Sequence, residues 1–157
     1  MSGVSSIPSP PQRVLLVEPD SRVRRALAAT LAASATVEAH ADFEPARERL
    51  DVSAPDLLVT NLRLRAFNGL HLAYVAQHAR LRTRAVVYSD QPEAWMTSEV
   101  RRAGAFFELA QRVPIVLRAY LGVQLPPADR RDPARFDRRG IPRGGRRMWD
   151  HHVAAIV

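Results

Sequence analysis

The stretch Pro55-Asp56-Leu57-Leu58-Val59-Thr60-Asn61 carries the most information about the fold of this chain. A short apolar run between turn-forming residues is typical of a strand that is buried on both faces, as in a parallel sheet covered by helices. The run ends in Asn61, whose neutral side chain carries a carbonyl acceptor and an NH2 donor. Similar apolar runs recur on both sides of this stretch.

Strand-like runs and amphipathic segments alternate along the chain. We expect strands at 13–17, 36–40, 56–60, 84–88 and 105–108, and helices beginning near residues 21, 42, 69, 92 and 113. This alternation predicts an α/β fold, a doubly wound five-stranded parallel sheet of the flavodoxin type. Ligands of such folds bind beyond the carboxyl ends of the strands. The site is therefore expected around residues 18–20, 60–61, 89–90 and 108–111.

Composition narrows the classes of function. The chain has 157 residues, of which 46% are hydrophobic, enough for one domain with a core. It has no cysteine, which excludes disulfides, thiolate metal sites and cysteine nucleophiles. All 23 basic residues are arginine, which excludes chemistry at a lysine amine. No apolar run is long enough for a membrane span and the first residues do not resemble a signal peptide, so we expect a cytoplasmic protein.

The ends of the chain differ in composition from its body. Residues 1–12 are rich in Ser and Pro and are expected to form a flexible leader. The folded body is predicted at 13–123, and a linker rich in Pro, Arg and Gly at 124–145. Residues 146–157 place Trp149, Val153 and Ile156 on one face, which predicts a short amphipathic helix that is too short to be stable alone.

The body resembles a response-regulator receiver domain of the CheY-like family. Pro55 to Asn61 is similar to the family's third strand, Gly69 to the glycine that opens its third helix, and 103–105 to its Ala-Gly-Ala turn. In that family the first strand ends in an acidic pair that holds magnesium, the third in the phosphoacceptor aspartate, and the fourth in Ser or Thr, while the fifth leads to a lysine. The resemblance places six residues at that pocket: Glu18, Pro19, Asp20, Asn61, Ser89 and Gln111.

The side chains at these positions do not suit the chemistry of the family. An amide at Asn61 cannot form an acyl phosphate, and Gln111 supplies no cation. Pro19 has no ligating atom, and a hard divalent cation needs several anionic oxygens. The family's aromatic switch residue falls at Glu108. The resemblance therefore implies a degenerate pocket with no catalytic activity and very weak or absent magnesium binding.

Each polar residue of this pocket also has an ordinary structural interpretation. Glu18 and Asp20 are of the type that caps a helix and complements its dipole. Ser89 could bond to its own backbone at the end of a strand. Asn61 is favoured in turns, and the alternative is that it mimics a fixed signalling state.

Receiver domains commonly signal through their fourth helix, fifth strand and fifth helix. Large aromatic residues with arginine are typical of interface anchors. The resemblance therefore implies a candidate interaction surface formed by Trp95, Met96, Arg101, Arg102, Glu108, Arg118 and Tyr120. Its partner is expected to be a signalling protein or a second copy of the chain.

These observations lead to one main hypothesis and two alternatives. The main one is a phosphorylation-independent receiver protein of bacterial two-component signalling that acts through protein contacts. The second is a DNA-associated regulator, because residues 146–157 resemble the first helix of a Fis-type bundle and the tail is rich in arginine. Four aspartates dilute that tail, so we favour a solvated linker. The third is a small ligand in the emptied pocket.

Overall fold

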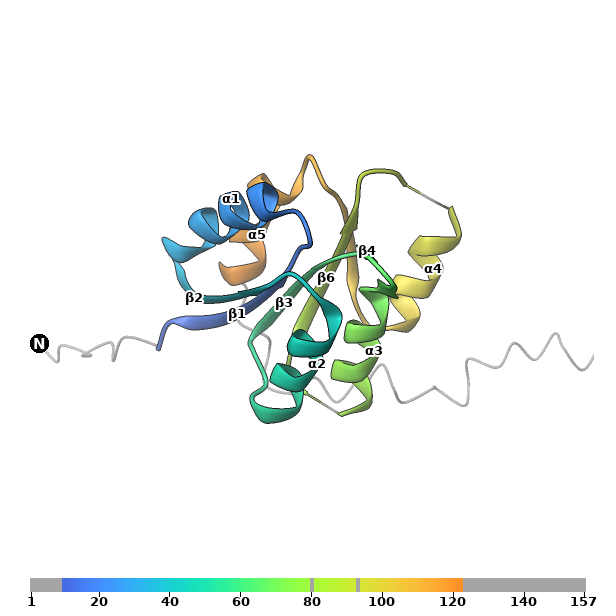
Figure 1. Ribbon diagram of the computed structural model, residues 1–157, viewed down its shortest axis with the longest axis horizontal. Coiled ribbons are helices and arrows are strands. Elements are labelled where there is room, and N and C mark those ends of the chain that lie inside the picture. Colours follow the sequence, from blue (N-terminus) through green and yellow to red (C-terminus); the bar gives the residue numbers. More distant parts are fainter. Residues whose placement is uncertain (1–9, 80, 93, 123–157) are drawn as a thin grey trace, which may run out of the picture. The chain divides into compact units, whose positions relative to one another are not determined.

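A five-stranded parallel sheet forms the centre of the domain (Figure 1). The computed structural model describes residues 10–79, 81–92 and 94–122. Within them the strand order is β2-β1-β3-β6-β7, and every neighbouring pair in this sheet is parallel. The strands are Gln12–Val17 (β1), Ala35–His40 (β2), Leu57–Asn61 (β3), Arg84–Ser89 (β6) and Phe106–Leu109 (β7).

Five helices alternate with these strands, as the sequence predicts. They are Ser21–Ala32 (α1), Phe43–Val52 (α2), Leu70–His78 (α3), Ala94–Arg102 (α4) and Val113–Gly122 (α5). The predicted α/β doubly wound fold is confirmed. The predicted linker at 124–145 and terminal helix at 146–157 lie outside the described residues, as does most of the predicted leader. In the part of the chain that the structure describes, no helix is both long and apolar enough to span a membrane.

Alternation along the buried strands divides the core into two layers. Successive side chains of a strand point to opposite faces. Val14 and Leu16 of β1 accordingly pack with the apolar residues of α1 and α5, whereas Leu15 and Val17 pack with those of α2, α3 and α4. Burial on both faces explains why the central strands are continuous apolar runs rather than alternating ones.

A hairpin that the sequence did not predict follows β3. Arg63–Leu64 (β4) pairs antiparallel with Phe67–Asn68 (β5), and Arg65 between them has a positive φ of 51°. The ring of Phe67 stacks on Phe43 at the start of α2, with centroids 4.7 Å apart. Two-residue strands are too short to show a periodic pattern, so these two could not be recognised from the sequence.

Gly69 closes this hairpin against the end of β3. A Cβ atom at Gly69 would lie 2.0 Å from the carbonyl oxygen of Asn61, a distance that no side chain tolerates. The Gly69 N–H donates to the Leu62 carbonyl over 2.8 Å. The glycine therefore allows the chain to return to Asn61 before α3 begins.

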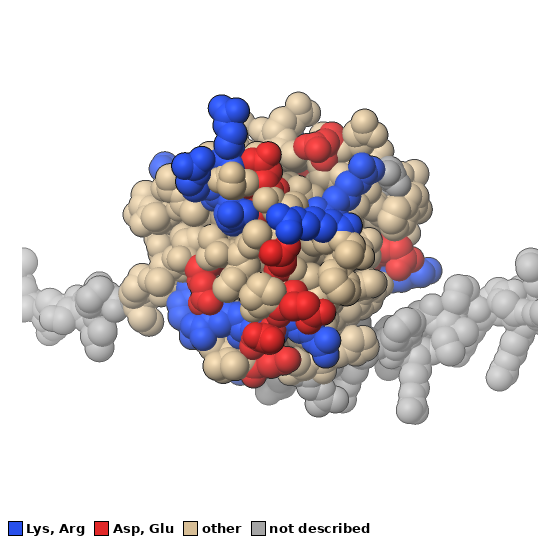
Figure 2. Space-filling view, in the orientation of Figure 1, with Lys and Arg blue, Asp and Glu red and all other residues tan. Residues whose placement is uncertain are grey.

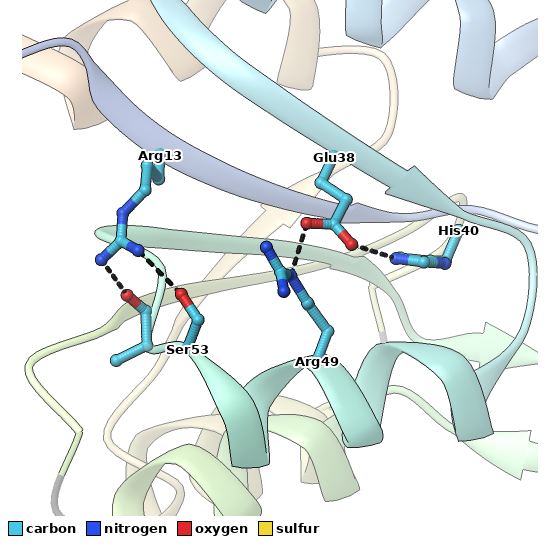
Figure 3. A network of polar contacts seen from close by, with 6 residues as sticks. Arg13, Glu38, His40, Arg49 and Ser53 are labelled. Carbon is cyan, nitrogen blue, oxygen red and sulfur yellow. Dashed lines mark hydrogen bonds and ion pairs between the residues drawn. The ribbon is translucent and has the colours of Figure 1, made fainter.

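Polar contacts attach α2 to the edge of the sheet (Figure 3). Arg49 of α2 and His40 of β2 each contact a carboxylate oxygen of Glu38, at 2.6 and 3.0 Å. The guanidinium of Arg13 donates to the Ser53 hydroxyl and the Ala54 carbonyl, both at 2.7 Å. Burial acts to raise the pKa of Glu38, but the bonds from His40 and Arg49 outweigh it and hold that pKa below its ordinary value.

Candidate functional site

Glu18 lies at the carboxyl end of β1 and is buried, with 2% of its surface exposed. Its backbone N–H donates to the His40 carbonyl over 3.0 Å, which continues the ladder to β2. Its Oε1 accepts from the Asp20 N–H over 2.8 Å. A buried carboxylate is costly unless hydrogen bonds compensate its lost hydration. The second oxygen, Oε2, therefore also needs hydrogen-bond donors.

Asn61 supplies one partner of that second oxygen. Its Nδ2 donates to Glu18 Oε2 over 2.9 Å, while its Oδ1 accepts from the Arg63 N–H over 2.9 Å. The second bond is the local turn bond expected for asparagine in the sequence. The first was not predicted, and only an amide can make both, because a carboxylate has no proton to donate to Glu18.

Tyr88 supplies the other partner. Its hydroxyl donates to Glu18 Oε2 over 2.5 Å from the neighbouring end of β6, and the residue is 1% exposed. Burial, together with the bond to the Glu18 carboxylate, raises the pKa of the Tyr88 hydroxyl far above its ordinary value. Tyr88 was missed in the sequence. A tyrosine directly before a polar strand end, within a strand buried on both faces, was the available signal, because a buried tyrosine hydroxyl usually finds a partner.

The turn after β1 is fixed by its own side chains. Asp20 is the N-cap of α1, and its Oδ1 accepts from the N–H groups of Arg22 and Val23 at 2.8 and 3.0 Å. These two backbone bonds, that from Val23 first, lower the pKa of Asp20. The capping interpretation is confirmed for Asp20. It is wrong for Glu18, whose carboxylate turns inward to Asn61 and Tyr88 and bonds no helix N–H.

Three other residues predicted for this pocket make no side-chain hydrogen bond to Glu18 among the described residues. Pro19 offers only its carbonyl, which accepts from the Arg24 guanidinium over 3.2 Å. Ser89 is buried at the end of β6, and its carbonyl accepts from the Ala110 N–H over 3.0 Å. Gln111 is exposed on the turn after β7, and no hydrogen bond among the described residues joins it to Glu18 or Asn61. The structure therefore joins Asp20 and Asn61 to Glu18 by hydrogen bonds, adds Tyr88, and among the described residues shows no such bond from Gln111.

The residues at this place do not fit a magnesium ion. Hard cations take several oxygen ligands, preferably anionic. The buried carboxylate here is Glu18, and three donors already occupy its two oxygens. Asn61 faces it with an NH2 group rather than an oxygen. Among the described residues there is no group of three or more His, Asp or Glu placed to hold a metal.

The residues of the candidate interaction surface differ in exposure. Trp95 is 53% exposed, and Arg101, Arg102 and Arg118 are exposed. Met96 is fully buried in the core with Val100, so the prediction for Met96 is wrong. Neighbouring residues of a helix point in different directions, and the i, i+4 pair of Met96 and Val100 takes the inward face.

Glu108 and Tyr120 of the predicted surface contact each other. The Tyr120 hydroxyl donates to Glu108 Oε1 over 2.8 Å. Burial and this bond raise the pKa of Tyr120 to about 12. Figure 2 shows acidic and basic side chains interspersed on the face that it displays, so that face carries no extended field of one sign.

Comparison with known proteins agrees with the fold. No protein-family model matches the chain, and no curated protein matches it. The structure is similar to the chemotaxis protein CheY4 of Vibrio cholerae, with a TM-score of 0.63 and 19% identity over 70% of this chain and 95% of that one. A Francisella response-regulator receiver domain gives a TM-score of 0.61 and 12% identity, covering 70% of this chain and 96% of that one.

A longer regulator shows the same likeness. The response regulator DrrB of Thermotoga maritima, an OmpR/PhoB homologue, gives a TM-score of 0.61 and 16% identity over 69% of this chain. The match covers 49% of DrrB. The structural neighbours are thus CheY-like receiver domains, and the fold of this chain is theirs.

Proposed function

We propose that this chain is a receiver-like signalling protein that works without phosphorylation and acts through contacts with other proteins. The observation that carries the proposal is the hydrogen bond from Asn61 to Glu18. An amide holds this carboxylate where receiver domains carry a metal-bound phosphoacceptor. A second donor, Tyr88, holds the same oxygen. The pocket is closed by the protein's own donors, which supports a fixed conformation rather than a phosphate switch.

Magnesium binding is expected to be very weak or absent. A metal ion would have to displace the Asn61 and Tyr88 donors from Glu18, and the buried NH2 and hydroxyl groups would then lack their partner. The turn after β1 supplies no second free carboxylate, because Pro19 follows Glu18 and the carboxylate of Asp20 caps α1. We therefore expect no phosphoryl transfer and no other catalytic activity.

Amide NMR with a phosphoryl mimic tests the proposal. The full chain is titrated with beryllofluoride and magnesium, and separately with acetyl phosphate and magnesium, beside a phosphorylatable receiver domain that verifies the reagents. We expect no saturable shift at Asn61, Ser89 or the β1 to α1 turn. Saturable shifts there would show that the pocket binds the mimic and would overturn the proposal.

A variant with the missing groups restored is the matched comparison. Combining Pro19→Asp, Asn61→Asp and Gln111→Lys returns a second acid, a phosphoacceptor and a cation to the positions that the resemblance assigns them. We expect magnesium-dependent amide shifts in this variant and none in the native chain. That result would show that these three residues are the reason why the native chain does not respond to the mimic. Shifts of equal size in both chains would contradict the proposal.

A further inference from the structure

The strand β7 lies at one end of the strand order of the sheet. Among the described residues it pairs with β6 and has no strand along its other edge. The Ala110 N–H donates to Ser89 of β6. Backbone groups of alternate residues point to opposite sides of a strand, so Glu108 and Phe106 also face β6. The N–H and C=O of Phe107 therefore point to the open edge, and neither makes a hydrogen bond among the described residues.

A groove of about 440 Å³ runs along this part of the molecule. Thr97, Val100 and Arg101 of α4 line one side, residues 105–108 line the middle, and Tyr120 of α5 lines the other side. Phe106 is 50% exposed, and its ring packs against Tyr120 with centroids 5.4 Å apart. The groove thus combines apolar walls with an unpaired strand edge.

Arginines lie at both ends of β7. Val100, next to Arg101, accepts the Ala105 N–H before the strand begins, and the Arg112 N–H donates to Leu109 where the strand ends. Arg101 and Arg112 are exposed and make no ion pair among the described residues, whereas Arg102 pairs with Glu99 at 2.7 Å. The acid of the groove, Glu108, already accepts from Tyr120. The two ends of the edge are therefore positive.

We propose that the edge of β7 binds an extended acidic segment of a partner protein, which joins the sheet as an additional strand. Main-chain hydrogen bonds to an exposed edge supply affinity in this mode of recognition, and pockets for alternate side chains supply specificity. Phe107 would pair with the backbone of the segment, its apolar side chains would enter the groove, and its acids would meet Arg101 and Arg112. The inference rests on the proposed function, that the chain acts through protein contacts.

Charge favours such a segment over a second copy of this chain. Two β7 strands paired antiparallel about a twofold axis would bring Arg101 of one copy beside Arg112 of the other. Like charges facing each other across an interface oppose association. An acidic segment meets favourable charge at both ends of the strand.

A synthetic peptide of alternating glutamate and valine is the probe, and fluorescence anisotropy with the full chain measures its binding. Two control peptides are used, one with lysine in place of glutamate and one with N-methyl groups on alternate amides, which removes strand pairing without changing charge. We expect binding of the acidic peptide alone, weakening as salt rises, with slowed amide exchange at Phe107. Equal binding of the methylated or the lysine peptide, or no binding of the acidic one, would overturn the proposal.

Charge-reversal variants locate the contact. Arg101→Glu and Arg112→Glu should each weaken binding about two- to fivefold, the effect of losing one exposed ion pair. Arg22→Glu with Arg25→Glu on α1 is the matched control and should leave binding unchanged. If the control weakens peptide binding as much as Arg101→Glu or Arg112→Glu does, the attraction is a general effect of charge and the proposal is overturned. If the acidic peptide does not bind and beryllofluoride causes no saturable amide shifts, the partner assigned here is wrong and the proposal of a phosphorylation-independent function stands.

Discussion

The amide nitrogen of Asn61 donates a hydrogen bond to the carboxylate of Glu18 over 2.9 Å, joining the carboxyl ends of β3 and β1. The two residues are 43 positions apart in the chain and meet because β1 and β3 are neighbours in the sheet. The side chain of Asn61 has no anionic oxygen, and its NH2 group supplies the donor that holds the Glu18 carboxylate.

Replacing Asn61 with aspartate should destabilise the fold at neutral pH. The change removes the donor to Glu18 and places two carboxylates together, costing about 1–3 kcal/mol for the unsatisfied buried group, with added repulsion. Two ionised carboxylates repel each other at this place, so the loss of stability should be smallest at acid pH, where one of them is protonated, and grow as the pH rises. Urea unfolding at several pH values measures it.

Asn68→Asp is the matched control for that experiment. Asn68 Oδ1 accepts from the Leu70 N–H over 2.8 Å at the start of α3, and a carboxylate can accept the same bond. We expect little change in the free energy of unfolding. Equal destabilisation by both substitutions would show that the contact with Glu18 is not the cause.

Tyr88→Phe should cost about 1–3 kcal/mol, because Glu18 would remain buried with one donor fewer. Tyr74→Phe is the control, since the Tyr74 hydroxyl lies 3.2 Å from Glu99 Oε2 on a half-buried surface and its loss should cost less. Chemical denaturation of both variants compares them. A cost for Tyr88→Phe no larger than that for Tyr74→Phe would contradict the role assigned to Tyr88.

Asp20→Ala should destabilise the protein more than Asp42→Ala. Both residues are N-caps, of α1 and α2, but only Asp20 makes side-chain capping bonds. The backbone bonds lower the pKa of Asp20 below its ordinary value of 3.8, so its contribution is present above that pH and lost as the pH falls through the folded-state pKa. Thermal unfolding at neutral and acid pH tests both points, and Asp20→Asn should retain most of the cap at either pH.

Gly69→Ala should destabilise the fold by about 1–3 kcal/mol or more, because the added methyl group meets the Asn61 backbone 2.0 Å away. Gly104→Ala is the comparison. Gly104 has φ +66°, but the nearest neighbour of an added Cβ is a flexible Gln77 side chain at 3.4 Å. Its cost should be about 1–2 kcal/mol, from the left-handed backbone alone. Denaturant unfolding that ranks Gly104→Ala as the more damaging would contradict this account of the hairpin.

Glu108→Ala should lower the pKa of Tyr120 from about 12, although burial will keep it above the ordinary 10.0. Carbon NMR of labelled tyrosine rings follows the titration. In the native chain the raised pKa means that the stabilisation from the Tyr120 bond is complete below pH 10.0 and is lost as the pH rises through about 12. An unchanged Tyr120 titration in the variant would show that Glu108 does not contribute.

Local pattern was sufficient for the framework of this protein. Runs such as Leu57 to Thr60 are apolar because the strand is buried on both faces, so their composition reveals both the strand and its parallel neighbours. Periodicity was less reliable within α4, where it did not distinguish the inward Met96 from the outward Trp95. The hairpin at Arg63 to Asn68 offered no pattern at all, since it is held by contacts with Phe43 and Gly69 rather than by its own periodicity.

The sequence by itself determined what the pocket lacks. Asn61 has no anionic oxygen to accept a phosphoryl group, the side chain of Pro19 has no ligating atom, and Gln111 carries no positive charge. These are properties of their functional groups and hold in any conformation. Only the tertiary structure showed which groups hold the Glu18 carboxylate. Tyr88 lies 70 residues from Glu18, and the parallel register of β1, β3 and β6 brings its hydroxyl and the Asn61 amide to the same carboxylate oxygen. Strand register is set by burial of the whole sheet, which no local stretch of sequence contains.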